Sequence, residues 1–187
     1  MQHVPQTLAW VAHALMQAQG ELVVAPETAV PLLPEQLAEL VPDYWPALRA
    51  RFEGSGRSAL IGVPLGDFQA GYTNSVVGLS PASRSGAPYR YDKVHLVPFG
   101  EFIPTGFRWF TQMMDIPLGG FARGPLNAPA FNVSVQRVAP NICYETVIPH
   151  VIRNQVATLD AAGNRPDVLV NLTNDAWYWG SSELDMH

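Results

Sequence analysis

Apolar positions along the chain follow two spacings, one typical of helices and the other typical of short buried strands. Leu8, Val11 and Leu15 recur every three or four residues, which predicts an amphipathic helix over 7–18. Further helices are expected over 43–52 and 147–161. Strands are expected at the apolar runs 22–25, 59–63, 73–79, 89–96, 131–135, 138–142 and 168–172. Because strands and helices alternate, the sequence predicts an α/β fold.

Turn-forming residues separate these elements. Asp43 is placed as an N-cap of the second helix, and the Gly-Ser-Gly run at 54–56 is expected to end that helix. Pro64 is expected to close the strand 59–63, while the loop 80–88 joins two strands into a hairpin or an adjacent pair. The segment 98–129 is rich in Gly, Pro and aromatic residues and has no clean period, so we expect a long structured loop that determines substrate specificity.

Composition narrows the class of protein. The 187 residues are 48% hydrophobic and 14% charged, which is typical of a globular protein, and no repeat or linker divides them. A net charge of -5 without a basic cluster argues against a nucleic-acid partner. No run of about 18 apolar residues is free of charge and proline, so no membrane span is predicted.

Cys143 is the only cysteine, and it stands where the apolar run 138–142 ends and a predicted helix follows. A thiol is a strong nucleophile only as the thiolate, and a helix N-terminus or a nearby cation lowers its pKa. The sequence therefore places Cys143 as a candidate nucleophile, with Lys93 as the nearby cation. Considered alone, a single cysteine is more often a small buried apolar residue than a nucleophile.

Two charged residues occur in comparable settings. Glu27 closes the apolar run 22–26, where a carboxylate is costly unless it has a partner or a proton to move, which suits a general base. Lys93 lies in the predicted strand 89–96, where its charge would stabilise an oxyanion. The alternatives are an exposed carboxylate capping the loop 28–34 and an ordinary edge-strand lysine. Together, a thiol, a carboxylate and an ammonium indicate acyl transfer.

A cysteine–histidine mechanism is a further alternative, since imidazole is the commonest base for a thiol. His95 shares the predicted strand of Lys93, and His150 lies near the start of the helix that follows Cys143. The chain's histidines are His3, His13, His95, His150 and His187. Their spacing matches no metal-ligand pattern, so we expect no metal and no cofactor.

Four stretches resemble the carbon–nitrogen hydrolase (nitrilase) superfamily and, within it, the apolipoprotein N-acyltransferases. They are VAPET at 24–28, YDKVHLVPFGEFIP at 91–104, ICYE at 142–145 and NLTNDAW at 171–177. The second and fourth are the specific ones. A generic amidase of the superfamily would share the Glu, Lys and Cys but seldom the whole run around Lys93.

The resemblance implies a Glu-Lys-Cys triad of Glu27, Lys93 and Cys143, in which Glu27 deprotonates Cys143 and Lys93 stabilises the oxyanion. It also implies that Glu101 supports the site. Tyr144, Glu145 and Trp177 match positions that line the pocket. The implied reaction moves an acyl chain from a phospholipid to the N-terminal amine of a diacylglyceryl-cysteine lipoprotein through a cysteine thioester. The aromatic segment 102–121 would contact acyl chains or the membrane surface, or alternatively form a packed lid.

The fold implied by the resemblance is a nitrilase-like four-layer αββα sandwich. We expect residues 1–187 to form a partial domain, incomplete at both ends. Members of the family carry transmembrane helices before this domain, which would bring it to the membrane surface on the periplasmic side of the bacterial inner membrane. Two alternatives stay open: a soluble amidase or carbamoylase of the superfamily, and an inactive gene fragment.

Overall fold

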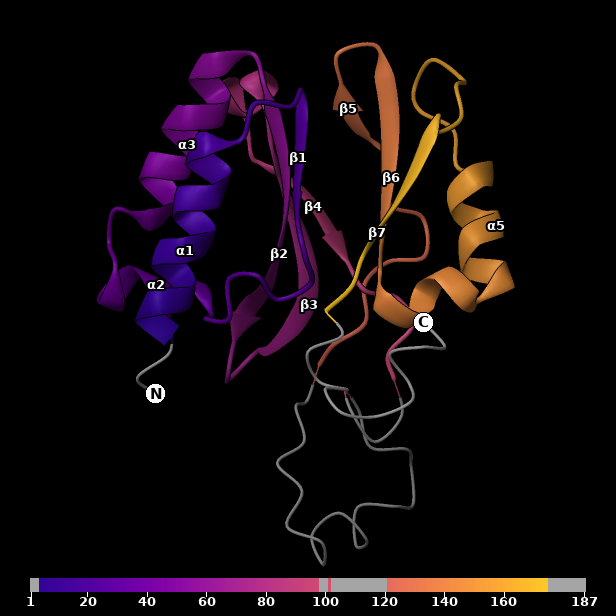
Figure 1. The fold of residues 1–187 in the computed structure, drawn as a ribbon. Helices are drawn as coiled ribbons and strands as arrows, with labels where there is room; N and C mark the ends of the chain where they lie inside the picture. The colour runs from indigo at the N-terminus through magenta and orange to yellow at the C-terminus, as the bar shows by residue number, and fades with distance from the viewer. Residues whose placement is uncertain (1–3, 98–100, 102–120, 175–187) are drawn as a thin grey trace, which may run out of the picture.

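The computed structural model describes residues 4–97, 101 and 121–174. In this part of the chain, two β-sheets face each other, and helices cover the outer face of each sheet (Figure 1). The order of layers is helix, sheet, sheet, helix. The prediction of an α/β fold with four αββα layers is therefore confirmed.

The first sheet has the strand order β1-β2-β3-β4. Its strands are β1 (Leu22–Ala25), β2 (Ser58–Asp67), β3 (Gly71–Leu79) and β4 (Tyr89–Asp92). Strand β1 pairs with β2 in parallel, whereas the pairs β2–β3 and β3–β4 are antiparallel. Strands β1, β2 and β4 consequently run in one direction, so their carboxyl ends lie at the same edge of the sheet.

Three helices cover the outer face of this sheet: α1 (Val4–Gln17), α2 (Pro34–Leu40) and α3 (Tyr44–Ser55). Alternation along β2 explains the packing, because Ala59, Ile61 and Val63 point to the helices while Leu60 points to the second sheet. Helix α3 ends at Gly56, whose φ of 72° is the left-handed conformation that glycine adopts without a steric penalty.

The second sheet has the order β5-β6-β7, formed by β5 (Phe131–Val133), β6 (Gln136–Ile142) and β7 (Val168–Leu172). Strands β6 and β7 are parallel, and helix α5 (Pro149–Ala157) lies on the outer face (Figure 1). Two short 3-10 helices complete the described structure, η1 (Pro81–Ser85) and η2 (Cys143–Val147). Helix η2 follows β6 directly, so the chain turns sharply at Cys143.

A hydrophobic core between the two sheets joins them. It contains Leu60, Val76 and Tyr91 from the first sheet and Phe131, Val138 and Leu172 from the second. Burial of these side chains fixes the spacing between the sheets, and with it the distance between functional groups carried on either sheet.

Three predicted strand ends are wrong. Strand β5 ends at Val133 rather than at residue 135. Strand β2 continues through Pro64 to Asp67. Strand β1 pairs with β2 only as far as Ile61, so the missing N–H of Pro64 removes no hydrogen bond on that side of β2. Strand β4 ends at Asp92, so Lys93 follows the strand rather than lying within it. Strands β3 and β4 are antiparallel neighbours, as predicted.

The predicted helix over 147–161 is also different. Ile148 has extended backbone angles that separate η2 from α5, and α5 begins at Pro149 because proline suits the first position of a helix. Helix α2 was not predicted. Its seven residues contain only two large apolar side chains, Leu37 and Leu40, which are too few to stand out from a loop.

Most of the expected specificity loop 98–129 lies outside the described residues, and so does the aromatic segment 102–121 except for Phe121. Trp177 also lies outside the described residues. Within the part that is described, no helix combines the length and apolar content required to cross a membrane.

Candidate active site

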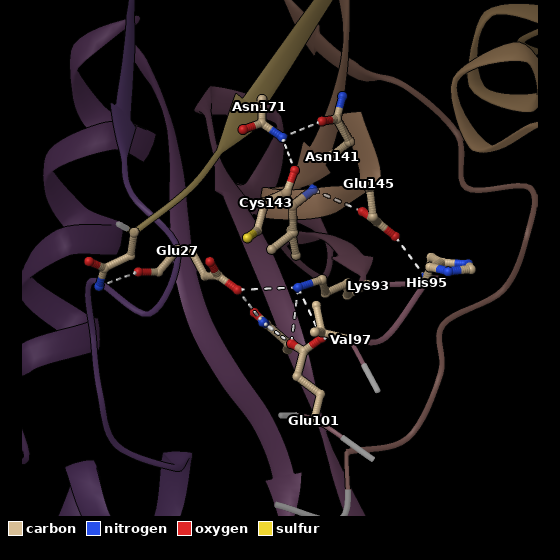
Figure 2. Close-up of polar contacts among 12 residues, drawn as sticks. Glu27, Lys93, His95, Val97, Glu101, Asn141, Cys143, Glu145 and Asn171 are labelled. Carbon is tan, nitrogen blue, oxygen red and sulfur yellow. Dashed lines mark hydrogen bonds and ion pairs between the residues drawn. The ribbon is translucent and has the colours of Figure 1, made fainter. Parts of the chain in front are cut away.

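The predicted catalytic residues come together where strands of both sheets end. Glu27 lies two residues after β1, Lys93 directly after β4, and Cys143 directly after β6. Figure 2 shows the Cys143 sulfur on the side that faces Glu27 and Lys93. Residues 27 and 93 thus come from the first sheet, and the candidate nucleophile comes from the second.

Lys93 lies between two carboxylates. Its Nζ is 3.5 Å from Glu27 Oε1 and 3.0 Å from Glu101 Oε2, and its side chain is only 1% exposed. The backbone N–H of Val97 donates to the same Glu101 oxygen, Oε2, at 2.9 Å, which fixes that carboxylate. Opposite charges at these distances offset the large cost of burying an ammonium.

The charges around Lys93 keep it protonated. Burial lowers the pKa of Lys93, but the carboxylates of Glu101 and Glu27 outweigh burial and leave the pKa above its usual value. Lys93 is therefore a permanent cation at neutral pH, suited to stabilise negative charge on a reacting oxygen.

Cys143 has an unusual backbone conformation. Its φ is 51°, in the left-handed region that non-glycine residues adopt at a cost, and the residue is 8% exposed. The Asn171 side chain donates to the Cys143 carbonyl at 2.9 Å and to Asn141 Oδ1 at 2.6 Å (Figure 2). These bonds hold the sharp turn that directs the sulfur out of β6.

The expected lowering of the Cys143 pKa is wrong for the resting site. Burial and the negative charge of Glu27 raise the pKa of the thiol. The charge of Lys93 and hydrogen bonds from Thr173 and the Tyr144 backbone oppose this rise without reversing it. Cys143 is therefore a neutral thiol at rest, and a base must remove its proton for it to act as a nucleophile.

Solved structures with a similar architecture include members of the CN-hydrolase superfamily. A CN-hydrolase superfamily protein from Xanthomonas campestris, with an arsenic adduct in its active site, has a TM-score of 0.62 at 19% identity, over 97% of this chain and 62% of that one. An amidase from Nesterenkonia sp. AN1 has a TM-score of 0.57 at 17% identity, over 91% of this chain and 61% of that one. The chain has the carbon–nitrogen hydrolase fold.

Comparison of this carbon–nitrogen hydrolase chain with sequence relatives gives a narrower result than comparison with solved structures. Apolipoprotein N-acyltransferase of Verminephrobacter eiseniae is 47% identical over 184 residues, which cover 98% of this chain and 33% of that protein. The enzyme of the same name from Ralstonia nicotianae is 42% identical over 184 residues, covering 98% and 34%. The chain is thus homologous to these proteins and spans about a third of their length. No family model matches it.

Glu145, the carboxylate of η2, is fully buried in this carbon–nitrogen hydrolase fold. It accepts hydrogen bonds from the backbone N–H groups of Val94, His95 and Ile142, at 2.7, 3.0 and 2.8 Å, and from the Tyr91 hydroxyl at 2.8 Å. Glu145 therefore ties the segment that carries Lys93 to the end of the strand that carries Cys143.

Tyr144 lies beside Cys143 on η2 with 45% of its surface exposed, a position open to a substrate. The imidazole of His95 packs edge-on against His150, with ring centroids 5.9 Å apart. The charges that act on Cys143 are those of Glu27 and Lys93. Among the described residues, no group of three or more potential ligands is arranged to hold a metal ion.

Sequence reasoning missed Asn74. From β3, its Nδ2 donates to Glu27 Oε1 at 2.6 Å and to Glu101 Oε1 at 2.8 Å, so one amide links both carboxylates. The alternation of side chains along β3 could have indicated it, because Asn74 and Val76 point to the same face and Val76 belongs to the core between the sheets. A buried polar side chain at a core position requires partners.

Proposed function

We propose that this chain carries the catalytic site of an N-acyltransferase that uses Glu27, Lys93 and Cys143. The acyl donor is a phospholipid such as phosphatidylethanolamine, and the acceptor is the N-terminal amine of a diacylglyceryl-cysteine lipoprotein. The observation that carries the proposal is a buried thiol held beside a carboxylate and a permanent cation. Homology to proteins named apolipoprotein N-acyltransferase supports the choice of reaction.

In the first half-reaction, Glu27 accepts the proton of Cys143 and the sulfur attacks the ester carbonyl of the phospholipid. The carbonyl oxygen becomes an oxyanion, which Lys93 stabilises with its ammonium. When the tetrahedral intermediate collapses, the carbon–oxygen bond breaks and the lysophospholipid leaves with the proton held by Glu27. The acyl group remains on Cys143 as a thioester.

In the second half-reaction, the lipoprotein amine attacks the thioester. Glu27 accepts a proton from the amine, an amide bond forms, and the carbon–sulfur bond breaks. The proton then returns to Cys143, which restores the starting state. Glu101 acts through Lys93 in both halves, because its carboxylate fixes the ammonium that stabilises each oxyanion.

Lipid substrates require access to a membrane. The homologous enzymes are about three times as long as this chain, and we propose that transmembrane helices in the remaining length place the site at the periplasmic face of the bacterial inner membrane. Residues 1–187 then form part of the carbon–nitrogen hydrolase domain of such an enzyme. The exposed Tyr144 ring and Trp177 are proposed to line the lipid pocket, with Glu145 behind it holding the two catalytic segments.

Intact-mass measurement tests the first half-reaction. The native chain is incubated in detergent with phosphatidylethanolamine, alongside Cys143→Ala and Lys93→Met. The proposal expects a gain of one acyl mass on the native chain, labile to hydroxylamine, with none on Cys143→Ala and a strongly reduced rate for Lys93→Met. No acyl gain on folded native protein, combined with turnover of small amides, would replace the acyltransferase proposal with an amidase.

A further inference from the structure

The segment 171–174 at the end of β7 contacts both halves of the site. Asn171 donates to the Cys143 carbonyl at 2.9 Å, and the Thr173 hydroxyl hydrogen-bonds the Cys143 side chain. Asn174 Nδ2 donates to the backbone carbonyl of Glu27 at 3.3 Å. Strand β7 therefore brings one short segment against the nucleophile, its backbone turn and the chain that carries the proposed base.

We infer that Thr173 is a further catalytic residue, which donates its hydroxyl hydrogen to Cys143 Sγ and stabilises the thiolate while it exists. The inference rests on the proposed function for its place in the acyl-transfer cycle. Its basis is geometric: Thr173 directly follows β7, and β7 pairs in parallel register with β6, whose last residue precedes Cys143. Residues just beyond two adjacent parallel strands lie side by side at the same sheet edge.

A thiolate at this position needs such a donor. The site is largely closed to water, so solvent cannot supply the hydrogen bonds that sulfur gains in solution. Lys93 already directs its ammonium to Glu101, at 3.0 Å. The Tyr144 backbone N–H supplies one hydrogen bond to the sulfur, and Thr173 supplies the second. Two fixed donors stabilise the anion at the moment when Glu27 has taken the proton.

The two asparagines on either side position Thr173. Asn171 bonds both Asn141 and the Cys143 carbonyl, which holds β7 to the strained turn, and Asn174 anchors the segment to the Glu27 backbone. With both ends of the segment fixed, the Thr173 hydroxyl has a defined place relative to the sulfur. Asn171 and Asn174 are thus positioning residues, and Thr173 is the group that contacts the reacting atom.

The pH dependence of Cys143 alkylation tests this inference without lipid. Because the chain has one cysteine, the mass gain from iodoacetamide reports that thiol alone. Thr173→Val keeps the shape but removes the donor, and we expect roughly tenfold slower alkylation at pH 7 with the rate profile moved to higher pH. Thr173→Ser keeps the hydroxyl and should retain a profile close to native.

Thermal melting of each variant checks that it is folded, and Thr173→Ala serves as a smaller second variant if Thr173→Val does not fold. A folded Val or Ala variant whose alkylation profile matches the native one would overturn the role of Thr173. The acylation assay with phosphatidylethanolamine is run in parallel. A shifted alkylation profile in a protein that never acquires an acyl group would reject the proposed function while leaving the role of Thr173 intact.

Discussion

Glu27 has two opposed effects on the Cys143 thiol. After burial, its negative charge is the largest cause that raises the pKa of Cys143, so at rest it keeps the proton on sulfur. Once Glu27 has taken that proton it is neutral, and its opposition to the thiolate disappears. In the proposed mechanism, a single carboxylate thereby keeps the resting thiol protonated and becomes the base when a substrate is present.

The substitution Glu27→Gln should separate these effects. Removing the negative charge lowers the pKa of Cys143, so alkylation by iodoacetamide should become about two- to tenfold faster at pH 7. Acyl transfer should fall by roughly 100-fold or more, because the general base is lost. Alkylation rates and thioester formation by intact mass measure the two effects. Parallel loss of both would show that Glu27 only maintains the structure.

Asn74 is the residue on which the arrangement of carboxylates depends. Asn74→Ala removes one hydrogen-bond donor from Glu27 and one from Glu101 and leaves Lys93, among the described residues, as the one side chain that contacts both carboxylates, so we expect a loss of about 1–3 kcal/mol in the free energy of unfolding and a lower rate of thioester formation. Asn132→Ala, on the exposed side of β5, is the matched control and should change neither quantity. Urea unfolding and the acylation assay measure them. A native acylation rate in Asn74→Ala would exclude this role.

At the scale of elements, Glu145 connects the chain after β4 to the end of β6. Glu145→Gln keeps the size but places an amide N–H among groups that are all donors. We expect a loss of about 3 kcal/mol in the free energy of unfolding. Glu39→Gln on the exposed side of α2 is the control for a lost charge. Equal urea midpoints for the two variants would show that the contacts of Glu145 do not hold the two elements together.

Gly62 allows β1 and β2 to place Glu27. A Cβ at this position would collide with the backbone of Pro26, Glu27 and Thr28, none of which can move as a flexible side chain does. Gly62→Ala should therefore displace Glu27, with a loss of about 1–3 kcal/mol in stability and roughly 100-fold in acyl transfer.

Gly54→Ala, in α3 where a Cβ has open space, is the matched control for Gly62→Ala. It should leave activity unchanged and stabilise the helix slightly. If Gly62→Ala transfers acyl groups as fast as Gly54→Ala, the prediction is wrong, and acyl transfer does not depend on the close approach of Gly62 to the Glu27 backbone.

Across the whole molecule, local patterns predict strands and the residues that follow them, but not the contacts between sheets. The runs before Glu27 and Cys143 are apolar and continuous, so both residues stand out as polar groups at strand ends. Asn74 and Thr173 do not stand out, because their partners lie at distant positions in the sequence and become neighbours only when the sheets pack. The raised pKa of Cys143 could not be predicted for the same reason: it depends on burial between two sheets.

The functional groups are distributed over both sheets, so the packing of the whole molecule determines their arrangement. The proposed base and cation belong to the first sheet and the nucleophile to the second, so their distances depend on the core between the sheets. The proposed acyl transfer and the alternative amide hydrolysis both use these three groups. What separates the two reactions is the group that attacks the thioester, an amine or water.

Single-turnover discharge of the Cys143 thioester tests the acyltransferase account most directly. The acyl-protein, formed from phosphatidylethanolamine and freed of donor, is mixed with a diacylglyceryl-cysteine peptide that has a free amine. An identical peptide with an acetylated amine is the control. The account predicts that only the free amine accelerates loss of the acyl mass, with equal gain of that mass on the peptide. Discharge at the same rate with both peptides, yielding free fatty acid, would contradict it and identify a hydrolase.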